Sequence, residues 1–204
     1  MSYIDEIDAR KWIEKNHPNN GLFRVYWKDI EGPYDGGVTF DLTEGKKLRW
    51  EWFYKDGQKD GVSKGWWPNG KLKHQWSWKN GISDGTWIYW NNDGLKFCEE
   101  NYSDGKLNGA RTTWYDNGQK ESDGTYKEGC RDGNWTEWYS SGQKKSLGTY
   151  DNELENGLWT YWSPDGNDVS KLVIKNGQPW NGRYIVWGKN GERKLERFYE
   201  NGIN

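Results

Sequence analysis

Long apolar runs and an excess of one charge are both absent from this chain of 204 residues. No apolar stretch approaches the roughly 20 residues of a membrane-spanning helix, and the first residues lack the apolar core of a signal peptide. The 29 Lys and Arg residues are balanced by 31 Asp and Glu residues, whereas proteins that hold nucleic acid through its phosphates carry a basic excess. We therefore expect a soluble, cytoplasmic protein with no stable membrane insertion and no nucleic-acid partner.

Residues with reactive or metal-binding side chains are also scarce. The chain has two cysteines, Cys98 and Cys130, and two histidines, His17 and His74. Neither cysteine belongs to a C-x-x-C pair, so we interpret both as free thiols in a reducing compartment. Neither histidine has an acidic or cysteine partner at a recognisable spacing, so we interpret both as solvated or capping residues. Because phosphate-binding glycine motifs are missing as well, the sequence predicts no metal, no cofactor and no enzyme activity.

Aromatic residues and glycines are abundant by contrast. A mean hydropathy of -1.23 with 32% hydrophobic residues is typical of disordered chains, but such chains are poor in aromatics. This chain has 17 Trp, 13 Tyr and 5 Phe, and each ring can bury roughly 150–250 Å². The 27 glycines indicate frequent turns and exclude long helices. We therefore expect a folded protein with an aromatic core.

A repeat of 24 residues runs through most of the chain. The repeats, which we name by their first residue, open at Gly61, Gly85, Gly109, Gly133 and Gly157, each 24 residues apart, and at Gly182 after one step of 25. The sixth place is always tryptophan: Trp66, Trp90, Trp114, Trp138, Trp162 and Trp187. The eighteenth place is a large apolar residue: Trp78, Tyr102, Tyr126, Tyr150, Ile174 and Tyr199. Conservation of two places in all six repeats indicates a common packing role.

Each repeat has the pattern of a β-hairpin. The first half, such as residues 85–90, is rich in aromatic and β-branched residues and runs to an Asn-Gly or Asp-Gly turn. The second half, such as residues 119–126, leads to another turn that usually contains glycine. The predicted fold class is therefore all-β, an elongated, twisted antiparallel β-meander of tandem hairpins of about 24 residues. Seven units at about 4.8 Å per strand would give a rod about 65–70 Å long.

Three regions are predicted along the chain. Residues 1–20 form an N-terminal cap with a short helix, which ends at the step from His17 to Pro18. Residues 21–60 contain degenerate repeats. Residues 61–204 contain the six regular repeats as one continuous domain. A cap is expected because the first strand of such a sheet would otherwise expose its edge.

The spacing G-x-W-x-x-W-x-x-N-G-x-K followed by Y-x-x-G-x-x-D-G resembles the bacterial MORN-variant repeat. The resemblance covers residues 61–204 and, in part, 37–60. The lysine that follows the first turn is present as Lys96, Lys120 and Lys144. The chain departs from the motif at Ser63, Arg111 and Glu153.

The MORN-variant resemblance implies a solenoid-like β-meander that serves as a recognition or assembly module. Many bacterial members are labelled antitoxins of toxin–antitoxin pairs. The related eukaryotic repeats were named for membrane junctions, which implies lipid contact as a further option.

Alternation along a strand divides each repeat between two faces. We assign the tryptophans of the sixth place and the apolar residues of the eighteenth place to the core. The third and fifth places vary and become candidates for contact with a partner: Trp87, Tyr89, Trp135, Trp159, Tyr161 and Tyr184. Such rings are typical of binding hot spots. Alternatively, these rings pack against one another inside a curled sheet.

Two classes of function follow from this pattern. The first is a non-catalytic binding protein whose sheet face recognises another protein, such as an inhibitor or antitoxin that sequesters or blocks its target. The alternative is a structural, adhesive or glycan-binding module, because a row of rings can also stack on sugars. Binding at a lipid surface ranks third, since the near-neutral charge disfavours anionic lipid. The identity of the partner and the oligomeric state stay open at this point.

Overall fold

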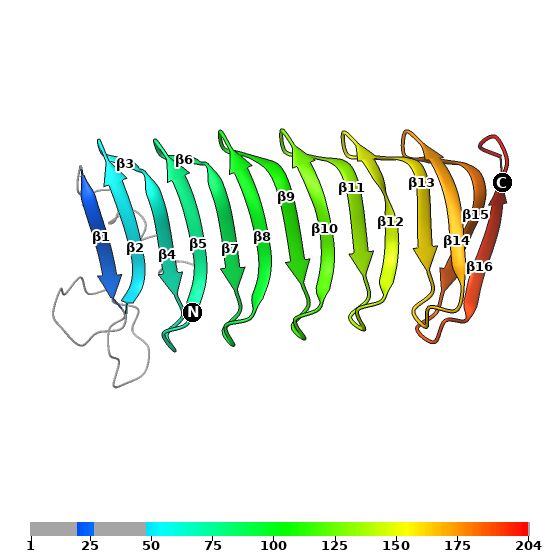
Figure 1. The fold of residues 1–204 in the computed structure, drawn as a ribbon, viewed down its shortest axis with the longest axis horizontal. Coiled ribbons are helices and arrows are strands. Elements are labelled where there is room, and N and C mark those ends of the chain that lie inside the picture. Colours follow the sequence, from blue (N-terminus) through cyan, green and yellow to red (C-terminus); the bar gives the residue numbers. More distant parts are fainter. Residues whose placement is uncertain (1–19, 27–47, 204) are drawn as a thin grey trace, which may run out of the picture. The chain divides into compact units, whose positions relative to one another are not determined.

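The computed structural model describes residues 20–26 and 48–203. The chain divides into an N-terminal unit, Met1–Leu95, and a C-terminal unit, Lys96–Asn204, and the division lies inside the Gly85 repeat. Every secondary-structure element assigned in the described residues is a β-strand, and the strands pair antiparallel within each unit (Figure 1). This confirms the predicted all-β meander. The helix predicted within residues 1–20 and much of the region 21–60 lie outside the described residues.

In its described residues, the N-terminal unit has five principal strands and two short ones. They are β1 (Gly21–Tyr26), β2 (Leu48–Lys55), β3 (Gln58–Lys59), β4 (Gly61–Trp66), β5 (Leu72–Lys79), β6 (Ile82–Ser83) and β7 (Gly85–Trp90). The principal strands follow the order β1-β2-β4-β5-β7, while β3 pairs with β2 and β6 with β5. Each strand therefore lies beside its neighbour in the sequence, as expected for a meander.

The C-terminal unit contains nine strands in sequence order. They are β8 (Lys96–Ser103), β9 (Lys106–Trp114), β10 (Lys120–Lys127), β11 (Cys130–Trp138), β12 (Lys144–Asp151), β13 (Leu154–Trp162), β14 (Val169–Lys175), β15 (Gln178–Trp187) and β16 (Arg193–Tyr199). Every consecutive pair is antiparallel. Strands β9, β11, β13 and β15 begin before the opening glycine of a repeat, so the hairpins overlap the repeat boundaries.

Two kinds of turn connect the strands. The turn between β10 and β11 has Glu128 at φ 51° and Gly129 at φ 91°, the pair of left-handed residues that a two-residue hairpin turn requires. The longer turn between β9 and β10 has Gly118 at φ 82°, and its amide donates to the Tyr115 carbonyl at 2.9 Å. The Asn-Gly and Asp-Gly signals of the sequence therefore mark real turns.

The opening glycines have a backbone conformation that is unusual in a strand. The six opening glycines from Gly61 to Gly182 have φ between 79° and 118°, a region that other residues rarely adopt. A Cβ on Gly133 would also lie 2.7 Å from Thr125 Oγ1, whose hydroxyl donates to the Asp132 carbonyl. The β10–β11 register shifts next to this point. Register shifts next to Gly109, Gly133 and Gly157 indicate β-bulges at these glycines, which increase the local twist.

Hydrogen bonds outside the strand ladders join repeats to one another. The amides of Gly129 and Gly177 donate at 2.8 Å to the carbonyls of Leu107 and Glu155, each of which lies two residues before the opening glycine of the donor's repeat. The Tyr139 hydroxyl donates to the Trp162 carbonyl at 2.8 Å. These bonds hold neighbouring repeats at a fixed spacing, because each joins a residue of one repeat to a residue of an adjacent repeat.

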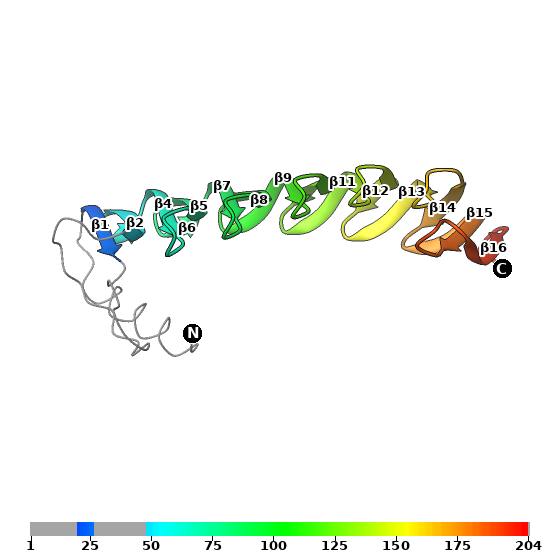
Figure 2. The same cartoon turned by 90° about the horizontal axis from the view of Figure 1, so that it is seen from below.

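The core of the C-terminal unit is formed by Trp135, Tyr150, Trp159, Leu172 and Ile174. Tyr150 and Ile174 of the eighteenth place are buried, as predicted. The other residues of this place are partly exposed: Trp78, Tyr102, Tyr126 and Tyr199. The long strands of this unit are curved rather than flat, as Figure 2 shows for β10 and β12. A curved single-layer sheet can cover its own rings with side chains from the next turn, and the Arg131 guanidinium lies 4.0 Å from the centre of the Tyr150 ring.

Candidate functional site

The candidate residues of the C-terminal unit form a continuous chain of ring contacts. Trp135 and Trp159 are only 5% and 2% exposed. Tyr150 lies between them, with its ring centre 5.8 Å from Trp135 and 5.2 Å from Trp159, both edge to face. The chain continues through Tyr161 to Tyr184, each step being 5.9 Å. The alternative in which these rings pack against one another is therefore confirmed, and an exposed row of rings at Trp135 and Trp159 is wrong.

A glycine two residues before the eighteenth place explains this packing. A Cβ added to Gly148 would lie 2.1 Å from Trp159 Cδ2, and one added to Gly124 would lie 1.9 Å from Trp135 Cε3. Trp135 and Trp159 therefore rest directly on the backbone of the preceding strand. The pairing of a glycine in one strand with a tryptophan in the next strand is visible in the sequence, and our assignment of residues to the two faces did not use it.

The two candidates in the N-terminal unit are also packed among rings. Trp87 lies 5.0 Å from Trp76 at 27°, and its indole nitrogen donates to the Ser77 carbonyl at 2.9 Å. Tyr89 meets Trp76 at 6.3 Å, edge to face. His74 is 3% exposed and stacks on Trp76 at 3.8 Å. Its interpretation as a solvated or capping residue is therefore wrong, while His17 lies outside the described residues.

The tryptophans of the sixth place lie on the other face of the sheet. We call the face of the C-terminal unit that carries Trp135 and Trp159 the buried face, and the face of β8–β14 that carries Thr136, Trp138 and Leu158 the open face. The sixth-place rings on the open face are partly exposed rather than buried. Their assignment to the core is therefore a second correction.

Lysines lie over three of the six sixth-place rings, so that part of the sixth place has a packing role without full burial. The nitrogens of Lys96, Lys120 and Lys144 lie 4.3, 5.7 and 6.0 Å from the ring centres of Trp114, Trp138 and Trp162. Each lysine follows the first turn of one repeat and contacts the tryptophan of the next. The motif residues thus form a ladder of cation–π contacts between repeats, each of modest energy at an exposed site.

The centre of the open face is a row that crosses the strands. Strand pairing places its members side by side in the order Glu99, Thr112, Asp123, Thr136, Leu147, Thr160 and Lys171. The threonines repeat every 24 residues. The residues between them change from acidic to apolar to basic along the unit.

Two leucines on the open face are exposed to solvent. Leu147 is 37% exposed, and Leu158, two residues before the cross-strand partner of Leu147, is 55% exposed. Leu158 pairs with Val173 on the next strand. We call Leu147, Leu158 and Val173, together with Lys144 and Lys171, the leucine–lysine patch. Its residues supply apolar area and positive charge and no reactive group.

A polar cluster interrupts the rings of the buried face at β8 and β9. Arg111 occupies a third place and donates through Nε to Glu100 Oε2 at 3.2 Å. Tyr102 donates to the other oxygen of Glu100 at 3.0 Å. Burial raises the pKa of Tyr102 to about 12 and that of the nearby Cys98 thiol to about 11. Since a thiolate is the reactive form of cysteine, the cluster holds charges in the fold and does not activate a nucleophile.

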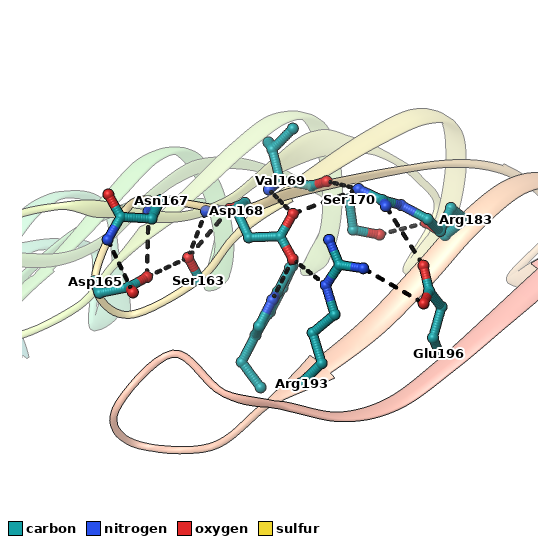
Figure 3. A network of polar contacts seen from close by, with 10 residues as sticks. Ser163, Asp165, Asn167, Asp168, Val169, Ser170, Arg183, Arg193 and Glu196 are labelled. Carbon is teal, nitrogen blue, oxygen red and sulfur yellow. Dashed lines mark hydrogen bonds and ion pairs between the residues drawn. The ribbon is translucent and has the colours of Figure 1, made fainter.

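A second polar network surrounds Asp168 at the start of β14 (Figure 3). Its carboxylate accepts bonds from Arg193 Nε at 2.7 Å, from Trp187 Nε1 at 3.1 Å and from the Val169 amide at 2.9 Å. The hydrogen bonds from Arg193 and Trp187 lower the pKa of Asp168 to about 2. Arg183 also lies 3.5 Å from this carboxylate. The network ties β14 to β15 and β16, because its donors come from all three strands.

Neither polar cluster provides a metal site. Within residues 20–26 and 48–203, no group of three or more His, Cys, Asp or Glu side chains could hold a metal ion. Cys98 and Cys130 are free thiols. In the same part of the chain, no helix is long and apolar enough to cross a membrane.

Comparison with known families identifies three of the repeats. A sequence profile described as the MORN repeat variant matches residues 59–80, 107–128 and 131–152. These segments begin two residues before the opening glycines Gly61, Gly109 and Gly133. MORN repeats are commonly protein-binding or membrane-binding modules. A search of curated proteins found no match.

Proposed function

We propose that this chain is a non-catalytic binding protein that recognises another protein through the open face of its β-sheet. The single observation that supports this proposal is the leucine–lysine patch. Leu158 is 55% exposed in the middle of a strand, although the neighbouring repeat has the polar Asn134 at the equivalent place. Exposed apolar residues that lie together on neighbouring strands, as Leu147 and Leu158 do, mark an interaction surface, whereas single ones do not.

The distribution of rings also favours the open face. The rings that could have stacked on sugars are committed to packing, since Trp135 and Trp159 are nearly inaccessible. Lysines lie over the sixth-place rings of Trp114, Trp138 and Trp162. Protein recognition therefore fits the accessible groups better than glycan stacking does. Inhibition of a target, as an antitoxin inhibits its toxin, is one form that such recognition takes, and we propose it as the finer hypothesis.

A pull-down from the source organism tests the proposal. The full chain and the double variant Leu147→Ser/Leu158→Ser serve as paired baits, and both must show the same thermal unfolding curve. We expect one protein to be retained in stoichiometric amount by the parent chain and lost with the double variant. Equal retention by both baits, or binding to a glycan array and to no protein, would reject recognition through the open face.

A further inference from the structure

The residues at the centre of the open face vary although the fold around them is constant. Every second member of the row is a threonine, namely Thr112, Thr136 and Thr160. Glu99, Asp123, Leu147 and Lys171 occupy the alternating fifteenth place of successive repeats. Because neither burial nor turn geometry constrains the fifteenth place, its chemistry is free to match something outside the chain.

The charges in the first part of the row are satisfied within the chain. Lys96 Nζ lies 2.7 Å from Glu99 Oε2, and Lys120 Nζ lies 2.6 Å from Asp123 Oδ2. These lysines also lie over Trp114 and Trp138. At these places the surface of β8–β10 therefore offers a partner no uncompensated charge.

The leucine–lysine patch lacks this compensation. Leucine replaces the acid at position 147, so Lys144 has a ring contact with Trp162 but no ion pair within the described residues. Lys171 is exposed and likewise forms no ion pair in that part of the chain. The acid on the same face of β12 is Asp151, at the far end of the strand opposite Leu154. The patch therefore combines exposed apolar area with two uncompensated positive charges.

This combination selects among the kinds of partner. Exposed leucines favour contact with apolar side chains, and uncompensated lysines favour carboxylates through charge complementarity. Recognition of anionic lipid usually rests on clusters of 4–8 basic residues, whereas this patch has two. A segment that lies across β12, β13 and β14 spans about 10 Å, because neighbouring strands are about 4.8 Å apart. Three to four extended residues cover that length.

We propose that the leucine–lysine patch binds a polypeptide segment in which an acidic residue lies within three residues of an apolar one. The apolar side chain packs between Leu147 and Leu158, and the carboxylate pairs with Lys171. This inference rests on the proposed function, since it names the chemistry of the partner at the same face.

Selection from a random peptide display library on the full chain tests the proposal. Selected peptides are then synthesised, and their dissociation constants are measured by fluorescence anisotropy. Two variants alter the patch, Leu158→Ser and Lys171→Glu. Two matched controls make comparable changes elsewhere: Ala110→Ser at the equivalent second place of the Gly109 repeat, and Lys127→Glu at the exposed end of β10.

The expected result is enrichment of peptides with Asp or Glu close to Leu, Ile, Val or Phe. Lys171→Glu should weaken their binding at least tenfold, Leu158→Ser about tenfold, and each control less than twofold. Peptides of another composition, or peptides whose binding survives both patch variants, would overturn the inference while leaving protein recognition intact. Failure to enrich any peptide, combined with Lys171-dependent binding to phosphatidylcholine–phosphatidylserine vesicles, would overturn both proposals. The absence of both peptide enrichment and vesicle binding would also overturn both proposals.

Discussion

Substitution of Gly148 by alanine should destabilise the protein through a single added methyl group. The new Cβ would lie 2.1, 2.2 and 2.6 Å from three atoms of the Trp159 ring, so the ring or the backbone must shift. That ring is 2% exposed and its indole nitrogen donates to the Thr149 carbonyl at 3.2 Å, so it has little room to move. Overpacking of this kind costs about 1–3 kcal/mol. A loss of about 2 kcal/mol would lower the Tm by roughly 4–8 °C for a chain of this size.

Urea unfolding followed by circular dichroism measures this loss. The control is Asn134→Ala on the exposed side of β11, for which we expect a change below about 0.5 kcal/mol. In a Trp159→Phe background the smaller ring makes room, so Gly148→Ala should cost at least about 0.5 kcal/mol less than in the parent. An unfolding free energy within about 0.5 kcal/mol of the parent, or equal costs in both backgrounds, would refute the packing argument.

Three further predictions concern single side chains. The pKa of Asp168 is lowered in the folded protein mainly by Arg193, so this carboxylate stabilises the protein above about pH 4 and the stabilisation is lost as the pH falls toward about 2. The difference in unfolding free energy between the parent and Asp168→Asn should therefore become smaller over that pH range. A difference that does not change with pH would contradict the role of Asp168. Glu153 has φ 71° at a place where the other repeats have glycine, and its carboxylate lies 2.8 Å from Arg131 Nε. Chemical denaturation should show that Glu153→Ala loses about 1 kcal/mol of unfolding free energy and that Glu153→Gly is nearly unchanged, because glycine relieves the backbone strain. Equal losses for the two variants would exclude strain relief. The raised pKa of the buried Cys98 thiol predicts that iodoacetamide at pH 8 labels it many times faster in urea than in the native protein, as mass spectrometry can measure, and fast native labelling would show that the thiol is accessible.

The period and element type could be predicted from the sequence because both depend on local rules. Glycines such as Gly133 recur where a bulge needs positive φ, and Asn-Gly or Asp-Gly pairs recur where hairpins turn. The burial of Tyr150 followed from its conserved place in the repeat. The opening glycines recur in all six repeats and the Asn-Gly or Asp-Gly pairs in five of them, so the pattern is stronger than the signal of any single position.

The choice of buried face could not be made from conservation within the repeat. Trp138 is conserved because it bridges repeats through Lys120, and a bridging role conserves a residue as strongly as burial does. Trp135 is buried although its place varies, since Arg111 occupies the same place and is paired with Glu100 instead. Such compensation between neighbouring repeats becomes visible only when the sixteenth place is compared with the third place of the next repeat. The leucine–lysine patch could be predicted neither from conservation within the repeat nor from comparison of neighbouring repeats, because it depends on which strands lie side by side.

The most direct test of this account compares two neighbouring residues, Leu158 and Trp159, by equilibrium unfolding of Leu158→Ser and Trp159→Ala. The side chains point to opposite faces of β13, one 55% and the other 2% exposed. We predict a loss of about 3–5 kcal/mol in unfolding free energy for Trp159→Ala and of less than about 1 kcal/mol for Leu158→Ser. Similar losses for both, or a larger loss for Leu158→Ser, would contradict the assignment of the faces and remove the basis for the proposed binding surface.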